Sequence, residues 1–458
     1  MSIEAYREFI ASRSVSQVKS GFKPSGLRDV LKVHQRNVVE FALERGKSAA
    51  FLDTGLGKSL IELEWADQVA QETGKPVLIL CPLAVAGQMV REGQKFGIDA
   101  RQVREANDVG AGVMVANYER LGKFDTSVFG GVAGDESSIL KSFQGKVRTQ
   151  LIDMFRDTPY KLAATATPSP NDYTEIGNHA DFLDVMTQSD MLTRWFIKDQ
   201  KGKGDWRLKG HAADDFWQWL ASYSRCATMP SDLGGDDTGY DLPKIDMHVH
   251  TLNADITQDA GDMLFRIPEL GATSFHSEKK LTMRQRCELA AELANSHDKP
   301  VTVWCERDDE SALLTSLIRD AREVKGSMSP DQKEELLLGF PDGKYRVIVS
   351  KPKLAGFGVN WQHCAHAVFA SVSYSYEQFY QAQRRSHRFG QKEVVRNDVV
   401  IADTEAAIWK AVNVKAEKHN EMKRRMAGSM KKAQLYSGLR VDYGYAEKIK
   451  FPEWMKGE

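Results

Sequence analysis

The chain has 458 residues, of which 42% are hydrophobic and 27% are charged, and its formal net charge at pH 7 is −1. This length predicts two or three domains, and the balanced charge excludes a general positive field, so a nucleic-acid site would have to be a local basic groove. Five widely spaced cysteines without a C-x-x-C pair argue against a disulfide framework and a zinc site. Because no apolar run approaches the ~20 residues of a membrane span and the N-terminus lacks a signal pattern, we expect a cytoplasmic protein with no membrane partner.

The first elements are an arm and a helix. Residues 1–24 are polar and mixed, and we expect an arm or short helix there. Apolar residues at helical spacing predict a core-facing helix over 31–43. That helix contains Gln35, which by itself would be an ordinary surface residue and gains interest only from the motif that follows it.

A phosphate-binding loop is predicted at 53–59, where the chain reads D-T-G-L-G-K-S between an apolar strand and a helix-like stretch. Glycines let backbone N–H groups surround an anion, and the helix N-terminus adds its positive dipole. Lys58 would reach the β- and γ-phosphates of a nucleotide, and the Ser59 hydroxyl would bind Mg²⁺. Leu52 occupies the place of the first glycine in the longer G-x-x-x-x-G-K-S pattern, which disfavours a kinase or GTPase. A plain glycine turn is the alternative.

Strands then alternate with helices. Buried strands are predicted at 76–82 and 112–116, a weaker one at 127–134, and another from Tyr160 onward. This alternation predicts a parallel sheet covered on both faces, whose ligands gather at the carboxyl ends of the strands. Pro82 and Asn117 would emerge at that edge beside the glycine loop.

An acidic pair, Asp135 and Glu136, follows the weaker strand. In nucleotide hydrolysis one carboxylate holds Mg²⁺ through water, and a second orients the attacking water and accepts its proton. Acidic pairs are common in loops, but the strand context and the sequence distance from Lys58 favour the catalytic interpretation. Thr165 and Thr167 end the next strand, where they are either a simple exit into a loop or part of the site.

Residues 186–280 differ in character and are predicted to form an insertion or linker. A basic, glycine-rich stretch there contains Trp206 and Arg207, a pattern compatible with nucleic-acid contact, although a solvated loop is the commoner explanation. His248 and His250 share a face of a predicted strand. Without a third ligand, we interpret both as structural.

A second alternation of strands and helices begins near residue 281, with strands predicted at 300–304, 345–350 and 367–370. The stretch 376–391 is too rich in arginine and glutamine for a good core helix. Arg385 and Arg388 lie three apart and would share one helical face, where two guanidinium groups suit a γ-phosphate. A solvated helix and a basic patch on a phosphate backbone are the alternatives.

The chain ends in a basic segment. Residues 411–435 carry many lysines and arginines against few acids and have a helical pattern. They would brace the second half, contact a phosphate track or form a solvated face.

Taken together, the motifs resemble superfamily-two helicases, in particular their Swi–Snf-type DNA translocase branch. The similarity is carried by D-x-G-L-G-K-S at 53–59, the acidic pair at 135–136, T-A-T-P at 165–168, G-x-N at 358–360 and Q-A-x-x-R-x-H-R-x-G-Q at 381–391. The last motif is the longest and the most specific. In its compact size and in the sequence K-P-K-L-A-G-F-G at 351–358, the chain resembles helicase-like proteins of bacteriophages and prophages. Such a protein would act in the bacterial host cytoplasm.

The resemblance implies an α/β fold of two tandem recombinase-like lobes with parallel sheets and an ATP cleft between them. The expected division is an N-terminal arm (1–24), an ATP-binding lobe 1 (25–185), an insertion (186–280), lobe 2 (281–415) and a basic tail (416–458). Departures from the family pattern are Ser137-Ser138 for Ala-His, Arg384 for Asp, and Lys351-Pro352-Lys353 for Ser-Thr-Arg.

The resemblance also assigns roles to individual residues. It implies ATP binding by Gln35, Thr54, Gly55, Leu56, Gly57, Lys58 and Ser59. Ser59 and Asp135 would bind Mg²⁺, Glu136 would orient water, and Arg385 and Arg388 would be arginine fingers. Coupling residues would be Thr165, Thr167, Gly358, Asn360 and Gln381. Nucleic-acid contacts would come from Pro82, Asn117, Trp206, Arg207, Lys351 and Lys353.

We therefore expect a nucleic-acid-stimulated ATPase that uses ATP and Mg²⁺ and translocates on double-stranded DNA. A strand-separating DNA or RNA helicase and an ATP-gated DNA clamp that does not translocate are the alternatives. The departures from the family pattern concern coupling and track contacts, so the expectation of ATPase chemistry is firmer than that of movement. The sequence indicates no particular protein partner.

Overall fold

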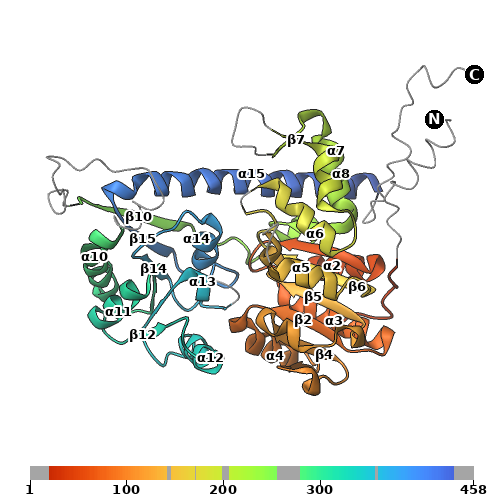
Figure 1. Ribbon diagram of the computed structural model, residues 1–458, viewed down its shortest axis with the longest axis horizontal. Coiled ribbons are helices and arrows are strands. Elements are labelled where there is room, and N and C mark those ends of the chain that lie inside the picture. The colour runs from red at the N-terminus through yellow and green to blue at the C-terminus, as the bar shows by residue number, and fades with distance from the viewer. Residues whose placement is uncertain are drawn as a thin grey trace, which may run out of the picture. The chain divides into compact units, whose positions relative to one another are not determined.

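The computed structural model describes residues 20–141, 146–170, 172–198, 206–254, 279–355 and 359–437. The chain forms two compact units (Figure 1). The first comprises Met1–Cys81, Glu92–Asp236 and Met422–Glu458, and the second comprises Pro82–Arg91 and Asp237–Glu421. Each unit contains a parallel sheet, so the predicted α/β fold with two tandem lobes is confirmed.

The first unit is built on a seven-stranded sheet with the strand order β3-β4-β2-β5-β6-β1-β9. Every neighbouring pair in it is parallel. Its central strands read as continuous apolar runs because both faces are covered by helices. The strands are β1 (Lys47–Leu52), β2 (Val77–Cys81), β3 (Ala100–Gln102), β4 (Val113–Asn117), β5 (Gly131–Asp135), β6 (Tyr160–Thr165) and β9 (Ser224–Ala227).

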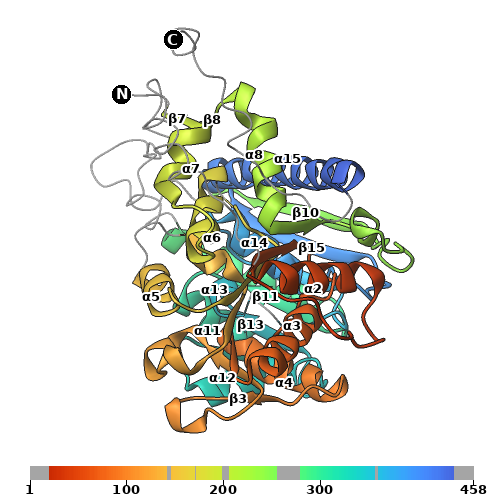
Figure 2. The same cartoon turned by 90° about the vertical axis from the view of Figure 1, so that its right-hand side faces the viewer.

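Helices flank this sheet, and Figure 2 shows α2 and α3 side by side. The helices up to residue 236 are α2 (Val33–Arg45), α3 (Lys58–Thr73), α4 (Ala86–Lys95), α5 (Lys146–Met154), α6 (Ile176–Phe182), α7 (Gln188–Trp195) and α8 (Ala213–Tyr223). A short antiparallel hairpin joins β7 (Phe196–Lys198) to β8 (Trp206–Leu208). Short 3-10 turns are η1 (Leu83–Val85), η2 (Ala106–Asp108), η3 (Tyr118–Lys123), η4 (Thr126–Val128), η5 (Ser137–Lys141), η6 (Tyr173–Glu175), η7 (Gly210–Ala212) and η8 (Pro230–Leu233).

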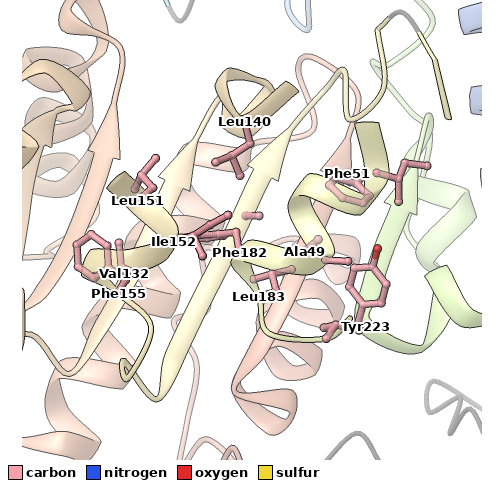
Figure 3. Packing of buried hydrophobic residues seen from close by; sticks show 14 of the residues in the cluster. Ala49, Phe51, Val132, Leu140, Leu151, Ile152, Phe155, Phe182, Leu183 and Tyr223 are labelled. Carbon is pink, nitrogen blue, oxygen red and sulfur yellow. The ribbon is translucent and has the colours of Figure 1, made fainter. Parts of the chain in front are cut away.

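The core of the first unit lies between the sheet and the helices that follow β5. Figure 3 shows part of it, with Ile152 and Phe155 of the α5 region close to Val132 of β5. Phe155 is fully buried, and burying a side chain of this size stabilises a fold by about 1.5–3 kcal/mol. Because this packing holds β5 and β6 in place, it also fixes where their carboxyl ends lie.

The prediction of a strand over 127–134 is wrong for the first half of that range. Thr126–Val128 forms the turn η4, because the Asp125 carboxylate caps it by accepting a hydrogen bond from the Ser127 N–H at 3.0 Å. Only Gly131–Asp135 extends as β5. The acidic pair still comes directly after a strand, as predicted.

The second unit contains a six-stranded sheet with the order β10-β15-β14-β11-β13-β12, and all its neighbouring pairs are parallel. The strands are β10 (Ile245–Leu252), β11 (Val301–Trp304), β12 (Ala321–Val324), β13 (Val347–Ser350), β14 (His366–Phe369) and β15 (Val395–Ala402). Its helices are α10 (Met283–Asn295), α11 (Asp308–Leu317), α12 (Pro330–Gly339), α13 (Pro352–Ala355) and α14 (Tyr376–Gln383), with the turn η9 (Asp403–Glu405). The strands predicted at 300–304, 345–350 and 367–370 are confirmed.

The long helix α15 (Ala406–Ser437) follows η9 and contains residues 411–435, the basic segment predicted to be helical. Residues 406–421 belong to the second unit, where Ile408 and Val412 are core residues. Residues from Met422 onward belong to the first unit, and Met422 and Met426 are part of its core. Among the described residues, no helix has the length and apolar character of a membrane span.

The two histidines on β10 make ordinary hydrogen bonds. His250 Nε2 lies 2.7 Å from the Oδ1 atom of Asp398, and His248 Nε2 lies 2.8 Å from the Asp246 carboxylate. The second Asp398 oxygen lies 2.6 Å from His366 Nε2. Within the described part of the chain, no cluster of three or more His, Cys, Asp or Glu side chains has the arrangement of a metal site.

Candidate nucleotide site

The phosphate loop lies between β1 and α3, as the sequence predicts. Gly55 and Gly57 both have positive φ angles, of 91° and 80°, in the region that favours glycine. A Cβ atom at Gly57 would lie 2.1 Å from the Nε2 atom of Gln35. The backbone angle therefore favours glycine at position 57, and a larger residue there would also push aside the Gln35 amide.

The helix α2 binds this loop directly. Gln35 is 6% exposed, its Nε2 donates to the carbonyl oxygen of Leu56 at 3.3 Å, and its Oε1 accepts from the N–H of Lys32 at 2.9 Å. The ring of His34 also contacts the loop, with Nε2 3.2 Å from the same Leu56 oxygen. The structure thus places Gln35 at the loop, and its role in ATP binding stays a prediction. His34 was not singled out from the sequence, because a buried histidine on a helix carries no motif.

The first turn of α3 carries Lys58 and Ser59. The ammonium group of Lys58 donates to the carbonyl oxygen of Leu52 at 3.0 Å, at the end of β1. At the other end of the loop, the carboxylate of Asp53 accepts a hydrogen bond from the Thr54 N–H at 2.7 Å. The lysine is therefore held over the loop by the protein's own backbone, and a bound phosphate would replace that carbonyl as its partner.

The acidic pair and the threonines meet at the same edge of the sheet. In the parallel register Asp135 is paired with Ala164, and Thr165 is paired with Phe51, so β5, β6 and β1 end side by side. The Thr165 hydroxyl donates to Glu136 Oε2 at 3.4 Å and accepts from the Thr167 N–H at 3.1 Å. These contacts form a chain from Glu136 to the T-A-T-P segment.

The carboxyl groups are held with little freedom. Asp135 and Glu136 are each 6% exposed, and the hydroxyl of Tyr118 donates to the Asp135 carbonyl at 2.7 Å. Glu136 has a φ of 52°, which is uncommon for a residue other than glycine, asparagine or aspartate. Backbone strain of this kind is typical of functional positions, where the surrounding structure over-determines the conformation.

Sequence reasoning missed a third carboxyl group, Glu62, which lies on α3 one turn after Lys58 and is fully buried. Burial and the negative charge of Asp135 raise the pKa of Glu62 well above its ordinary value, against the opposing effect of Lys58. Its spacing from Lys58 was the available signal, because residues four apart share a helical face.

These groups fit a nucleotide-bound magnesium ion. The two buried carboxyl groups of Asp135 and Glu136, with a single lysine, leave negative charge that a divalent cation would compensate. Mg²⁺ in such sites is held mainly by substrate phosphates and water, with one or two protein ligands. Ser59 and Asp135 would be the protein ligands.

In the second unit, the predicted helical placement of the two arginines is wrong. The helix α14 ends at Gln383, so Arg385 and Arg388 lie in the turns that follow it. The cause is local: the Nε atom of Arg385 donates to the carbonyl of Gln381 at 3.0 Å, the carbonyl that would accept the next helical N–H. The expectation that this stretch makes a poor core helix is also wrong, because most of α14 is buried.

The two arginines still converge on one point. Arg385 Nη1 donates to the carbonyl of Val359 at 2.9 Å, and Arg388 Nη1 donates to the same oxygen at 3.3 Å. Arg385 is 2% exposed and also donates through Nη2 to Gln381 Oε1 at 3.0 Å, whereas Arg388 is half-buried. Arg388 is thus better placed to reach a ligand, and Arg385 is bound within the unit.

The remaining predicted residues belong to both units. Asn360 accepts a hydrogen bond from the Gln362 N–H at 3.3 Å, and Gly358 lies outside the described residues. Lys351 pairs with Asp308 at 2.7 Å. The other nucleic-acid candidates are exposed at Lys353 and Arg207, partly buried at Pro82 and Trp206, and buried at Asn117.

Comparison with known proteins identifies the class. Residues 283–390 match the family described as "Helicase conserved C-terminal domain". The chain is also 23% identical over 455 residues to the DNA annealing helicase and endonuclease ZRANB3 of Mus musculus; the match covers 88% of this chain and 42% of that protein. The chain thus spans less than half the length of this curated relative. A solved structure, the Sulfolobus solfataricus SWI2/SNF2 ATPase core in complex with dsDNA, is 16% identical and gives a TM-score of 0.42 over 91% of this chain and 97% of that one.

The helicase domain in the second unit, together with the phosphate loop and acidic pair in the first, defines an ATP-hydrolysing enzyme. More particularly, residues 283–390 of its second unit are similar to the conserved C-terminal domain of helicases.

Proposed function

We propose that this enzyme is a DNA-stimulated ATPase of the Swi–Snf type that translocates on duplex DNA. The observation that carries the proposal is the meeting of Lys58, Asp135 and Glu136 at one sheet edge, in a chain whose other unit is a helicase C-terminal domain. The name of the mouse relative, which refers to DNA, supports the choice of partner.

The proposed chemistry uses residues in the positions described above. Lys58 exchanges the Leu52 carbonyl for the β- and γ-phosphates, while loop N–H groups surround the anion. Mg²⁺, when bound through Ser59 and Asp135, supplies charge neutralisation on the phosphates. Glu136 orients the attacking water and accepts its proton, and the hydrogen bond from Thr165 holds that carboxylate in place.

The second unit would contribute the arginine finger. We assign this role to Arg388 and a positioning role to Arg385, because the latter is buried and bound by three internal hydrogen bonds. An arginine finger stabilises the charge that develops on the transferred phosphoryl group, and in related enzymes it accelerates hydrolysis by about 10³–10⁵. Without Arg388, turnover would fall while ATP binding by the first unit stays nearly intact.

The deciding experiment compares the ATPase rate with no polymer, with single-stranded DNA, with duplex DNA and with RNA. We expect the highest rate with duplex DNA, and a stimulation that falls with salt according to the number of phosphate contacts. Equal rates in all four conditions would refute the proposal. If duplex DNA does stimulate the ATPase, a triplex-displacement assay would distinguish a translocase from an ATP-gated clamp. Release of a labelled strand from a duplex would instead indicate a strand-separating helicase.

A further inference from the structure

The second half of α15 packs beside the phosphate loop within the first unit. Met422 and Met426 are only 2% and 4% exposed and belong to the apolar core of that unit. Met426 and Ala427 also line a small hollow, whose opposite walls are the ends of β1, β6 and β9. Two buried methionines one turn apart leave this part of the helix little freedom to rotate or slide, because each fills space in a packed core.

Lys423 lies on this part of α15, and its side chain points toward the phosphate loop. Its Nζ atom lies 3.1 Å from the Oδ1 atom of Asp53, and the two side chains are only 12% and 14% exposed. The same carboxylate oxygen accepts the Thr54 N–H at 2.7 Å, and the Asp53 N–H donates to the Ala227 carbonyl at 2.9 Å. Asp53 therefore joins a loop amide, the edge strand β9 and the C-terminal helix.

The charge of Asp53 has an electrostatic consequence for the loop. A carboxylate at the entrance to a loop that binds phosphates repels the several negative charges of a nucleotide, and the repulsion is strong where water is partly excluded. An ammonium group at 3.1 Å cancels most of that field. A mostly buried, charge-assisted contact of this kind is stronger than a pair on an open surface.

We propose that Lys423 is a positioning residue for ATP binding, which neutralises Asp53 and holds the start of the phosphate loop in its anion-accepting form. The proposal rests on the proposed function, because it takes ATP to be the ligand of the loop. It makes the C-terminal helix a part of the nucleotide site, although no residue of α15 belongs to a nucleotide-binding motif. Lys423 has no contact with the reacting atoms in this scheme, so its loss would weaken binding more than the chemical step.

The test uses the full chain, a fluorescent ATP analogue and steady-state ATPase measurements. We expect Lys423→Met to raise the Kd of the analogue and the KM for ATP about tenfold, with kcat changed less than about twofold, since hydrogen bonds to charged groups are worth at least this factor. Lys423→Arg should restore affinity. The double variant Asp53→Asn/Lys423→Met should recover most of it, because the uncompensated charge is gone. Lys432→Met, an exposed lysine on the same helix, is the matched control and should bind as the wild type does.

The outcomes separate the two proposals. If wild-type protein binds no ATP analogue, the proposed function is wrong, and the role of Lys423 is wrong with it. If wild-type protein binds the analogue and Lys423→Met binds it equally well, only the role of Lys423 is overturned. If the double variant is as weak as Lys423→Met, the pair is a structural anchor and charge neutralisation is refuted.

Discussion

The contrast between Arg385 and Arg388 gives the sharpest prediction. Replacing Arg385 with alanine removes three donors from a buried site and leaves the carbonyls of Val359 and Gln381 without these partners. Hydrogen bonds from a charged group contribute about 1.5–3 kcal/mol each and are not additive, so we expect a local loss of at least about 3 kcal/mol. Arg388 is half-buried and its bond to the Val359 carbonyl is longer, at 3.3 Å, so its replacement should cost less than that of Arg385.

The assay is hydrogen exchange by mass spectrometry on the full chain, together with ATPase turnover. A loss of 3 kcal/mol corresponds to exchange about 100-fold faster in peptides covering α14 and β15. We expect this acceleration in Arg385→Ala and little change in Arg388→Ala, whereas Arg388→Ala should lose about 10³-fold in kcat with ATP affinity retained. Arg384→Ala, in the same turn, is the control. Full turnover in Arg388→Ala would refute the finger assignment, and equal exchange in both variants would refute the reasoning from burial.

Three further predictions concern other parts of the chain. Glu136→Gln should bind ATP normally but hydrolyse it about 10²–10⁴ times more slowly in single-turnover experiments, since general-base catalysis typically contributes that factor; unchanged rates would exclude the role. Gly57→Ala should weaken binding of an ATP analogue, because alanine is strained at a φ of 80° and its Cβ would displace the Gln35 amide from the loop, whereas Gly74→Ala, also at positive φ but in open space and away from the loop, should bind normally. Burial raises the pKa of Asp398, but hydrogen bonds with two imidazoles and a guanidinium hold that pKa well below its ordinary value. The stability that the ionised Asp398 carboxylate contributes is therefore present above pH ~4 and lost as the pH falls further. The Asp398→Asn variant should accordingly be less stable than the wild type near neutral pH, and its stability should change less with pH during acid unfolding.

The elements close to the phosphate loop were largely predictable because their signals are local. Glycine spacing, an apolar run and a helical period all fall within a few residues of Lys58, and the structure has the expected strand, turn and helix there. The acidic pair was found for the same reason, since it directly follows β5. Local agreement between propensity and pattern is what makes such segments predictable.

Other features depend on contacts between distant residues. β9 completes the first sheet next to β1, yet Ser224–Ala227 is short, contains a buried arginine and lies in the stretch interpreted as an insertion. Neither the strand order nor the approach of Lys423 to Asp53 has a signature in sequence spacing. The helical placement of Arg385 failed because its own side chain takes the carbonyl that would have continued the helix.

The hydrogen bond between Lys58 and the Leu52 carbonyl has a consequence for the enzyme's cycle. Because the Lys58 ammonium already donates to this carbonyl, an incoming phosphate must compete with the carbonyl for the lysine. When the product leaves, the carbonyl can accept the same hydrogen bond again. Lys58 thereby keeps a hydrogen-bond acceptor between turnovers. After ADP is released, Lys58 therefore stays positioned over the loop for the next ATP molecule.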